Sequence, residues 1–345
     1  MQLEKELLKQ KARKLLEQLL SVYTPSGQEG LAKGIFQNIA DELNLNLYVT
    51  STNSFFLGDG EILLASHIDT VPGYIPPSIS DNEITGRGAV DAKGPLASMI
   101  LASWIMNERG CKVQVGALSD EENKSAGARE LVSSGKRFSH IIVGEPTNTT
   151  HIAVEYRGLL RINVNCHGKP EHSSSATNNI ILKYIPAILE SSQLPSQYSS
   201  PSIVPTIVRS GDSPNVTPSD FYVHFDVRYP YGISEGDIIS KMSEKFEGCD
   251  LTVGESIPPV KVGPSTPAVR ALMRGLLQQG VKPSLVRKGG TSDMNLLISI
   301  TPSIATYGPG DSRLEHTEFE RITLDEIYIA TLTYVNALEE LCLKR

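Results

Sequence analysis

Short apolar runs alternate with stretches of helical periodicity over residues 1–154 of the chain. Leu3–Leu20 carries leucines at helical spacing and stops before the breaker Thr24-Pro25-Ser26-Gly27. Apart from a Pro- and Gly-rich loop at 71–90, the pattern predicts strands over Leu47–Leu57, Glu61–Ser66, Lys112–Leu118 and His140–Val143, and helices over Pro95–Glu108 and Ser125–Ser133. This alternation is typical of an α/β fold, with a mostly parallel, mixed sheet flanked by helices.

The pattern changes after Glu155 and returns to α/β alternation towards the end of the chain. In between, strands and helices are predicted in the order Leu159–His167, Asn179–Leu189, Ile203–Arg209, Asp220–Arg228, Ser234–Phe246 and Asp250–Gly254. This β-α-β-β-α-β order predicts a small α+β domain of ferredoxin-like type. The chain is therefore expected to form a discontinuous domain, 1–154 and 259–345, with an inserted domain at 155–258.

Two helix starts in the last part of the sequence are marked by local signals. Thr266-Pro267 begins a helix, because proline suits the first helical position, and Gly280 stops it. Thr323-Leu-Asp-Glu326 has the form of a capping box, which predicts a last helix reaching to about Leu343.

Length and composition agree with two packed domains and exclude several classes of protein. The chain has 345 residues, 40% of them hydrophobic, so it can bury sizeable cores. Its net charge of −7 argues against a nucleic-acid partner, because phosphate binding needs a basic surface. No apolar run approaches the roughly 20 residues that cross a bilayer. The cysteines at 111, 166, 249 and 342 are scattered without a Cys-x-x-Cys pair, which predicts unpaired thiols in a soluble cytoplasmic protein.

Side chains that can bind metals follow the predicted strands. His67-Ile-Asp69, Asp120-Glu121-Glu122 and Gly144-Glu145 each come after a short apolar run, Asp91 follows a Gly-rich turn, and His316 precedes the last helix. Because the carboxyl ends of strands in an open α/β sheet present functional groups at one edge, we expect these side chains to converge. Two imidazoles with several carboxylates suit two zinc-like ions. The sequence therefore predicts a metallohydrolase.

The spacing of these residues predicts a task for each. Residues i and i+2 of a strand point the same way, so Asp69 can orient His67 while the imidazole binds a metal. Asp91, held on its turn, suits a carboxylate that bridges two metals. Glu121 and Glu122 are adjacent and point apart, so one can bind metal while the other exchanges protons with water and the leaving amine.

Taken alone, each motif has a simpler interpretation. Gly86-x-Gly88 lacks the third glycine of a dinucleotide-binding loop, and the Gly-x-Ser-x-Gly elbow of serine hydrolases does not occur. Asp120-Glu121-Glu122 would ordinarily be a solvated acidic turn, but here it follows a strand that reads as buried. A metal-bearing but inactive binding protein would be expected to lose Glu121 or Asp69 first, and both are present.

Together these motifs resemble those of the M20 metallopeptidase family, which includes acetylornithine deacetylase, succinyl-diaminopimelate desuccinylase, carboxypeptidase G and aminoacylase. The resemblance covers nearly the whole chain and implies two divalent ions per subunit, zinc or cobalt, with manganese left open. One ion would be held by His67, Asp91 and Glu145, and the other by Asp91, Glu122 and His316. Asp69 would orient His67, and Glu121 would act as general base and acid.

The resemblance extends to the inserted segment, which matches the family's lid and dimerisation domain and implies a homodimer. Gly168-Lys-Pro-Glu-His172-Ser173 is similar to a family element whose histidine stabilises the oxyanion in a neighbouring subunit's active site. Ala176 departs from the pattern, because relatives usually have proline there. The positions that resemble those binding the substrate carboxylate or lining the substrate side are Asn215, Arg228, Gly290, Thr291 and Ser292.

Within the family, the compact length and the run Ser66-His-Ile-Asp-Thr-Val-Pro-Gly73 look most like one group of hydrolases. These release lysine or ornithine from the γ-carboxyl of the C-terminal glutamate of an acidic carrier protein, LysW, in lysine and arginine biosynthesis. The resemblance thus implies LysW as the partner. The alternatives are a deacylase of small N-acyl amino acids, such as acetylornithine, and a di- or tripeptidase.

Overall fold

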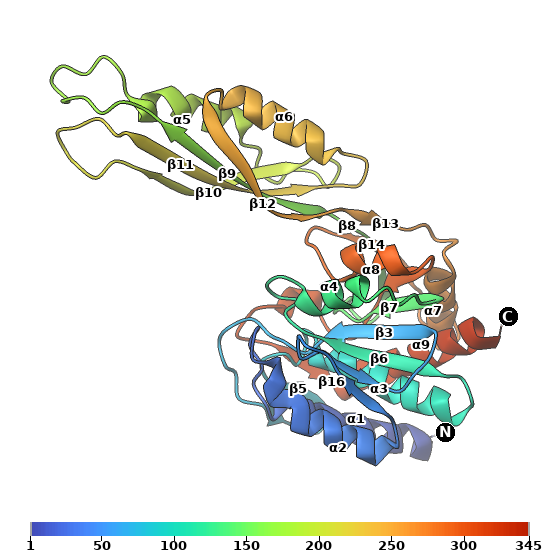
Figure 1. Ribbon diagram of the computed structural model, residues 1–345. Coiled ribbons are helices and arrows are strands. Elements are labelled where there is room, and N and C mark those ends of the chain that lie inside the picture. Colours follow the sequence, from blue (N-terminus) through green and yellow to red (C-terminus); the bar gives the residue numbers. More distant parts are fainter. Residues whose placement is uncertain (1, 344–345) are drawn as a thin grey trace. The chain divides into compact units, whose positions relative to one another are not determined.

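A computed structural model describes residues 2–343, which form two compact units (Figure 1). The first unit includes the chain up to Val154, Val262–Arg287 and the part from Ser292 onward. The second unit spans Glu155–Lys261 and Lys288–Thr291. The sequence predicted the insertion at 155–258. In the structure the second unit reaches to Lys261 and also includes Lys288–Thr291, which begins at the last residue of strand β14 (Ser284–Lys288).

A mixed sheet of nine strands carries the metal-binding motifs. Strand β3 (Ile62–His67) pairs in parallel with both β6 (Val113–Leu118) and β7 (His140–Val143), and β15 (Ile304–Thr306) pairs in parallel with β7, whereas the outer pairs are antiparallel. This agrees with the predicted α/β class. Along the sheet the order is β1 (Leu47–Val49), β2 (Phe55–Leu57), β6 (Val113–Leu118), β3 (Ile62–His67), β7 (His140–Val143), β15 (Ile304–Thr306), β8 (His151–Tyr156) and β13 (Val260–Lys261), with β14 paired to β8.

Helices cover both faces of this sheet (Figure 1). Alternate strand residues such as Ile62 and Leu64 join one core with helices α1 (Gln2–Leu20), α2 (Lys33–Leu43), α3 (Lys93–Glu108), α7 (Pro267–Leu277) and α9 (Leu324–Leu343). On the other face lie α4 (Ala126–Ser133), which packs on β6, and α8 (Met294–Leu297), which packs on β15. Within residues 2–343, no helix is long and apolar enough to cross a membrane.

Local signals that mark the ends of helices are realised in the structure. Glu326 Oε2 accepts from the Thr323 N–H at 2.9 Å, and Thr323 Oγ1 accepts from the Glu326 N–H at 3.2 Å, which is the predicted capping box.

The remaining short elements are the 3-10 turns η1 (Glu29–Ala32), η2 (Ile298–Ile300) and η3 (Ser312–Leu314), and a small sheet of β16 (Arg321–Thr323), β5 (Glu83–Thr85) and β4 (Ser78–Ile79).

The second unit contains a separate, fully antiparallel sheet with two helices. Its elements follow the predicted order, namely β9 (Gly158–His167), α5 (Ile180–Ser191), β10 (Ser202–Ser210), β11 (Asp220–Tyr229), α6 (Glu235–Lys245) and β12 (Cys249–Ile257). The sheet order is β10-β11-β9-β12. Asn179 caps α5 by accepting from the N–H groups of Ile181 and Leu182, and Ser234 caps α6. The unit has the ferredoxin-like topology expected from the sequence.

The N-terminal region differs from its prediction in two places. Leu47–Leu57 was expected to be one strand, but it is a hairpin of β1 and β2 that turns at residues 50–54. Its turn contains Asn53 in the left-handed region (φ 63°), which asparagine tolerates better than most residues. Helix α2 was not predicted, although Phe36 and Ile39 give it a buried face that stacks on Phe55.

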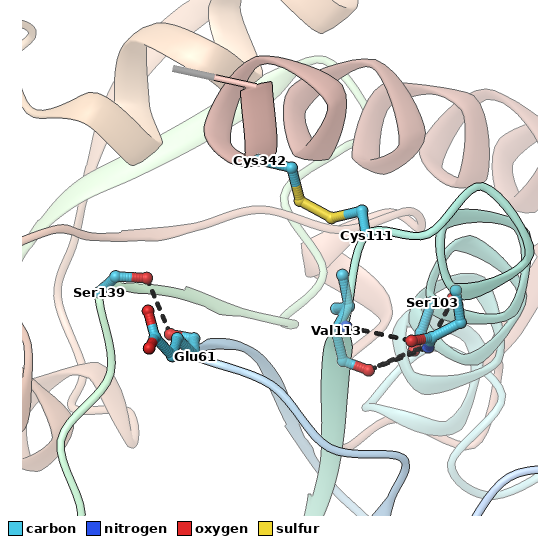
Figure 2. Close-up of a disulfide and its surroundings, with 7 residues drawn as sticks. Glu61, Ser103, Cys111, Val113, Ser139 and Cys342 are labelled. Atoms are coloured by element: carbon cyan, nitrogen blue, oxygen red, sulfur yellow. Dashed lines mark hydrogen bonds between the residues drawn. A yellow bond between two sulfur atoms is a disulfide. The ribbon is translucent and has the colours of Figure 1, made fainter. Parts of the chain in front are cut away.

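The prediction of unpaired cysteines is wrong, because the structure contains two disulfides and no free cysteine within the described residues. Cys166 and Cys249 face each other in the register of β9 and β12. Figure 2 shows Cys111, which follows α3, bonded to Cys342 in the last turn of α9. The paired cysteines are 83 and 231 residues apart in the chain, so their spacing gave no indication of the pairing. Both pairings depend on tertiary contacts.

Candidate metal centre

Three strands bring potential ligands to one edge of the sheet. Strand β3 ends at His67, whose register partner on β6 is Leu118, just before the loop that carries Glu121 and Glu122. Strand β7 ends opposite Ala65 of β3 and is followed by Gly144 and Glu145. Because these strands are parallel, their carboxyl ends coincide, and the predicted convergence takes place.

Asp91 lies between the two histidines. Its Oδ1 is 3.1 Å from His67 Nε2, and its Oδ2 is 3.1 Å from His316 Nε2. The turn before it needs glycine, because Gly88 has φ 87° and an added Cβ would lie 2.8 Å from Thr70 Cγ2. One carboxylate therefore presents an oxygen to each of two imidazoles that are far apart in the sequence.

Two glutamates complete the arrangement around Asp91. Glu145 Oε2 lies 3.9 Å from His67 Nε2, and Glu122 Oε2 lies 2.9 Å from His316 Nε2. Ligand atoms of His67, Asp91 and Glu122 all lie within 4.8 Å of one another. Such nitrogen and carboxylate donors suit zinc and similar divalent ions. The donor set fits two cations that share Asp91, with His67 and Glu145 on one side and His316 and Glu122 on the other.

The charges around the two imidazoles also fit a cation site. Burial opposes protonation of His67, but Asp69, Asp91 and Glu145 raise its pKa above the ordinary value. Hydrogen bonds to Asp91 and Glu122 raise the pKa of His316 to about 10. The carboxylates thus favour a positive charge at each imidazole. Metal binding needs neutral imidazoles, so it would replace these protons.

Glu121 has the environment of a proton-transfer group. Burial raises the pKa of its carboxyl well above the usual range, and the charge of Glu145 raises it further. Its main-chain N–H donates to Asp69 Oδ1 at 3.0 Å, which holds the loop in place beside the centre. A carboxylate whose pKa is raised is a stronger base than an exposed one, so Glu121 is suited to exchange protons with a nearby water.

Asp69 contacts both His67 and the loop of Glu121. His67 Nδ1 is 2.9 Å from the main-chain oxygen of Asp69 and 3.5 Å from its Oδ1. The carboxylate also accepts from the N–H groups of Glu121 and Glu122, at 3.0 and 3.1 Å, and from Ser26 Oγ at 2.7 Å. That Asp69 orients His67 stays a prediction.

Two residues near the centre were missed by sequence reasoning. Ser26 is hydrogen-bonded to Asp69, and Glu29, which is 2% exposed, accepts from the N–H groups of Asp120 and Gly27 at 3.0 and 2.9 Å. The segment 24–29 therefore holds the loop of Glu121 from the N-terminal side. The sequence marks this segment only as the end of a helix, and its turn composition carries no sign of these contacts.

The substrate-side residues expected from the sequence are placed as follows. His172 is exposed, with Nδ1 2.8 Å from Ser174 Oγ, and its neighbour Ser173 donates from N–H to the main-chain oxygen of Asn215. Arg228 contacts Asp226 at 2.9 Å and Thr291 Oγ1 at 3.5 Å. His172, Asn215, Arg228, Gly290 and Thr291 belong to the second unit and Ser292 to the first. Their tasks stay predictions.

Asp293 follows this loop and is buried in the first unit. Burial raises the pKa of its carboxyl to about 7, against a hydrogen bond with Ser125 that lowers it. Its Oδ1 has no hydrogen-bond partner in the described part of the chain. In the chain, Asp293 directly follows the predicted substrate-side residues Gly290, Thr291 and Ser292.

The model of peptidase family M20/M25/M40 matches residues 63–340. The chain belongs to this family. Two M20 relatives have the same name, LysW-lysine/LysW-ornithine hydrolase. The protein of Sulfurisphaera tokodaii is 54% identical over 345 residues, covering 100% of both chains. That of Saccharolobus solfataricus is 55% identical over 339 residues, covering 98% of each.

Solved M20-like structures share the fold at low identity. A tripeptidase from Staphylococcus aureus matches with a TM-score of 0.86 at 18% identity, covering 98% of this chain and 99% of the other. Aminopeptidase PepT from Bacillus cereus matches with a TM-score of 0.84 at 20% identity, covering 96% and 98%. These matches support the fold class, and membership of the family makes this chain a metallohydrolase of amide bonds.

Proposed function

We propose that this chain releases lysine or ornithine from the γ-carboxyl of the C-terminal glutamate of a LysW-type carrier protein. The observation that carries the proposal is the identity of 54–56% over essentially the full length with hydrolases named for LysW-lysine and LysW-ornithine. The donor arrangement around Asp91 supplies the chemistry that such a cleavage needs. The carrier protein would be the substrate that docks on this chain, in lysine and arginine biosynthesis.

The residues of the centre divide the work of amide hydrolysis. His67, Asp91 and Glu145 would hold one divalent ion, and Asp91, Glu122 and His316 the other, with zinc or cobalt as the candidates. Bound ions of this kind lower the pKa of a bound water and polarise a carbonyl oxygen. Glu121 would take the proton of the attacking water and return it to the leaving α-amino group. Burial, which raises its pKa, makes the Glu121 carboxylate a stronger base for the first of these steps.

The predicted substrate-side residues would supply the remaining contacts to the substrate. We expect Arg228 and Asn215, with Gly290, Thr291 and Ser292, to hold the carboxylate of the released amino acid, because a guanidinium pairs with both oxygens. His172 would stabilise the oxyanion, acting from a neighbouring subunit. A cytoplasmic location also stays a prediction.

We further propose a homodimer formed through the second unit. Helix α5 leaves Leu182, Ile185 and Leu189 exposed by 72%, 42% and 72%, and these residues lie on one side of the helix. Strand β10 lies at the edge of its sheet, and near its start Ile203 pairs with Gln193. An exposed apolar stripe on a helix is typical of a surface covered by a partner.

A paired release assay tests the proposed function. Metal-loaded protein is incubated with one of two substrates. The first is a carrier protein that bears γ-linked lysine or ornithine, and the second is free N-acetylornithine. The released amino acid is measured by mass spectrometry. We expect release from the carrier and little from acetylornithine. Release from acetylornithine alone would contradict the proposed substrate and move the chain to the small-molecule deacylases, with the metal chemistry unchanged.

A further inference from the structure

We propose that the buried ion pair of Arg87 and Glu320 is a positioning device that fixes His316 relative to Asp91. It would thereby determine the affinity of the metal site that these two ligands share. This inference rests on the proposed two-metal centre and adds two residues to it that do not themselves touch a metal. Neither residue is among the candidates that the sequence identified.

Asp91 and His316 reach the centre on loops that leave the same end of one strand pair. Strand β5 is followed by the turn at 86–91, and β16 is preceded by the loop at 316–320. The two strands are antiparallel, with Thr85 opposite Arg321. The end of β5 and the start of β16 are therefore side by side, and the two ligand-bearing loops begin there.

Glu320 binds the turn that leads to Asp91. Its Oε2 accepts from the N–H of Gly88 at 2.9 Å and, at the longer distance of 3.4 Å, from that of Val90. Its main-chain oxygen accepts from the N–H of Gly86 at 3.3 Å. A residue on the His316 side thus holds three main-chain groups of the Asp91 turn.

Arg87 makes the reciprocal contacts, from the Asp91 turn to the His316 loop. Its Nη1 group donates to Glu320 Oε1 at 2.5 Å and to the main-chain oxygen of Thr317 at 3.0 Å. Its Nε donates to the oxygen of Gly73 at 2.8 Å. Thr317 directly follows His316, so the Arg87 guanidinium holds the main chain next to this candidate ligand.

Packing restrains His316 little. Its side chain is 54% exposed, its imidazole contacts only the other candidate ligands Asp91 and Glu122 among the hydrogen bonds of the described residues, and its main chain is in the left-handed region at φ 62°. By contrast, the side chain of Glu320 is 1% exposed and that of Arg87 is 7% exposed. Burying such a pair often adds little stability compared with an apolar pair, so its hydrogen bonds are better explained by the geometry that they impose.

Two substitutions distinguish an effect of the pair's hydrogen-bond geometry on the metal site from an effect of its charge. Glu320→Gln keeps the size of the side chain but turns an amide N–H towards groups that need an acceptor. Arg87→Lys keeps the positive charge but loses the planar fork that reaches Glu320 and Thr317 together. The matched control is Arg321→Met, which removes an exposed ion pair with Glu83 (3.5 Å) between the same two strands.

The test is titration of the metal-free proteins with Co²⁺, followed by the visible absorption of the bound ion and by melting temperature. We expect two equivalents to bind to the wild-type protein and to Arg321→Met. In Glu320→Gln and Arg87→Lys, the affinity for one equivalent should fall by about 10- to 100-fold, as expected when support for a ligand is lost. The loss in Arg87→Lys, with the charge retained, would mark an effect of geometry.

Two results would overturn the inference. In one, folded Arg87→Lys binds both equivalents as tightly as Arg321→Met. In the other, both equivalents weaken equally in step with a lower melting temperature of the metal-free protein, which would show a purely structural role. If the wild-type protein binds fewer than two equivalents, the proposed two-metal centre itself fails, so the two failures are distinguishable. Substrate identity does not enter this experiment.

Discussion

Glu121 and Glu122 are neighbours in the chain, but their carboxyl groups meet different surroundings. Glu122 lies 2.9 Å from His316 Nε2, whereas Glu121 is placed by its main chain against Asp69, with a pKa raised by burial and by Glu145. One side chain is thus suited to a cation and the other to a proton. This difference at adjacent positions would allow a single loop both to bind metal and to perform the proposed acid–base chemistry.

Glu121→Gln should lower the turnover number by about 100-fold or more, because the amide cannot accept the proton of the attacking water. The metal content should stay near two equivalents, since Glu121 is not among the proposed ligands. Turnover and metal content are measured on the same samples. The neighbouring control, Glu122→Gln, should instead weaken metal binding on the His316 side. Retained turnover in Glu121→Gln would contradict its assignment as the base.

At the scale of elements, the strand ends were predictable and the contacts between distant segments were not. Apolar runs followed by His67, Glu121 and Glu145 carry a local signal, and the parallel sheet brings them together as predicted. Asp69 and Glu29 hold the Glu121 loop through side chain to main chain bonds that leave no periodic trace. Strands β8 and β15 were also missed.

Glu130 on α4 offers an element-scale test of how helix and hairpin are joined. Its carboxylate accepts from the N–H and Oγ of Ser51, at 3.1 and 2.6 Å, and from Thr52 in the turn of β1 and β2. Burial opposes ionisation, but the hydrogen bonds together outweigh it and lower the pKa of Glu130 to about 2, from an ordinary 4.5. A lowered pKa stabilises the folded state above pH 4.5, and this contribution is lost as the pH falls towards 2.

Glu130→Gln should therefore melt at a lower temperature than the wild-type protein at pH 6, and the difference should shrink between pH 4.5 and pH 2. Melting temperatures of both proteins across this interval give the comparison. A difference that stays constant with pH would show that the charge of Glu130 does not matter to the hairpin.

On the scale of the whole molecule, one disulfide lies within each unit. Cys111–Cys342 joins the start of β6 to the end of the chain's last described helix, so it closes a loop that includes the entire second unit (Figure 2). Cys166–Cys249 joins two neighbouring strands of the second unit. Such cross-links also occur in intracellular proteins of hyperthermophilic archaea and bacteria. The cysteines therefore give no reason to expect a reducing compartment.

Removing the long-range bond should destabilise the first unit. Cys342→Ser should cost about 2–4 kcal/mol of unfolding free energy, the usual contribution of a disulfide, and lower the melting temperature by several degrees. Adding reductant should lower the melting temperature of the wild-type protein towards that of Cys342→Ser. Thiol counting after denaturation without reductant should find no reactive thiol in the wild type and one in Cys342→Ser. Four reactive thiols in the wild type would refute the pairing.

The most direct test of the two-metal hydrolase is the rate of lysine or ornithine release by metal-free protein as Zn²⁺ or Co²⁺ is added in measured equivalents. We predict no turnover without metal and a rate that rises until two equivalents per chain are bound, because Asp91 presents one oxygen to each of the two imidazoles that would hold the ions. Full turnover by the metal-free protein, or a rate that is complete at one equivalent while the second never binds, would contradict the account.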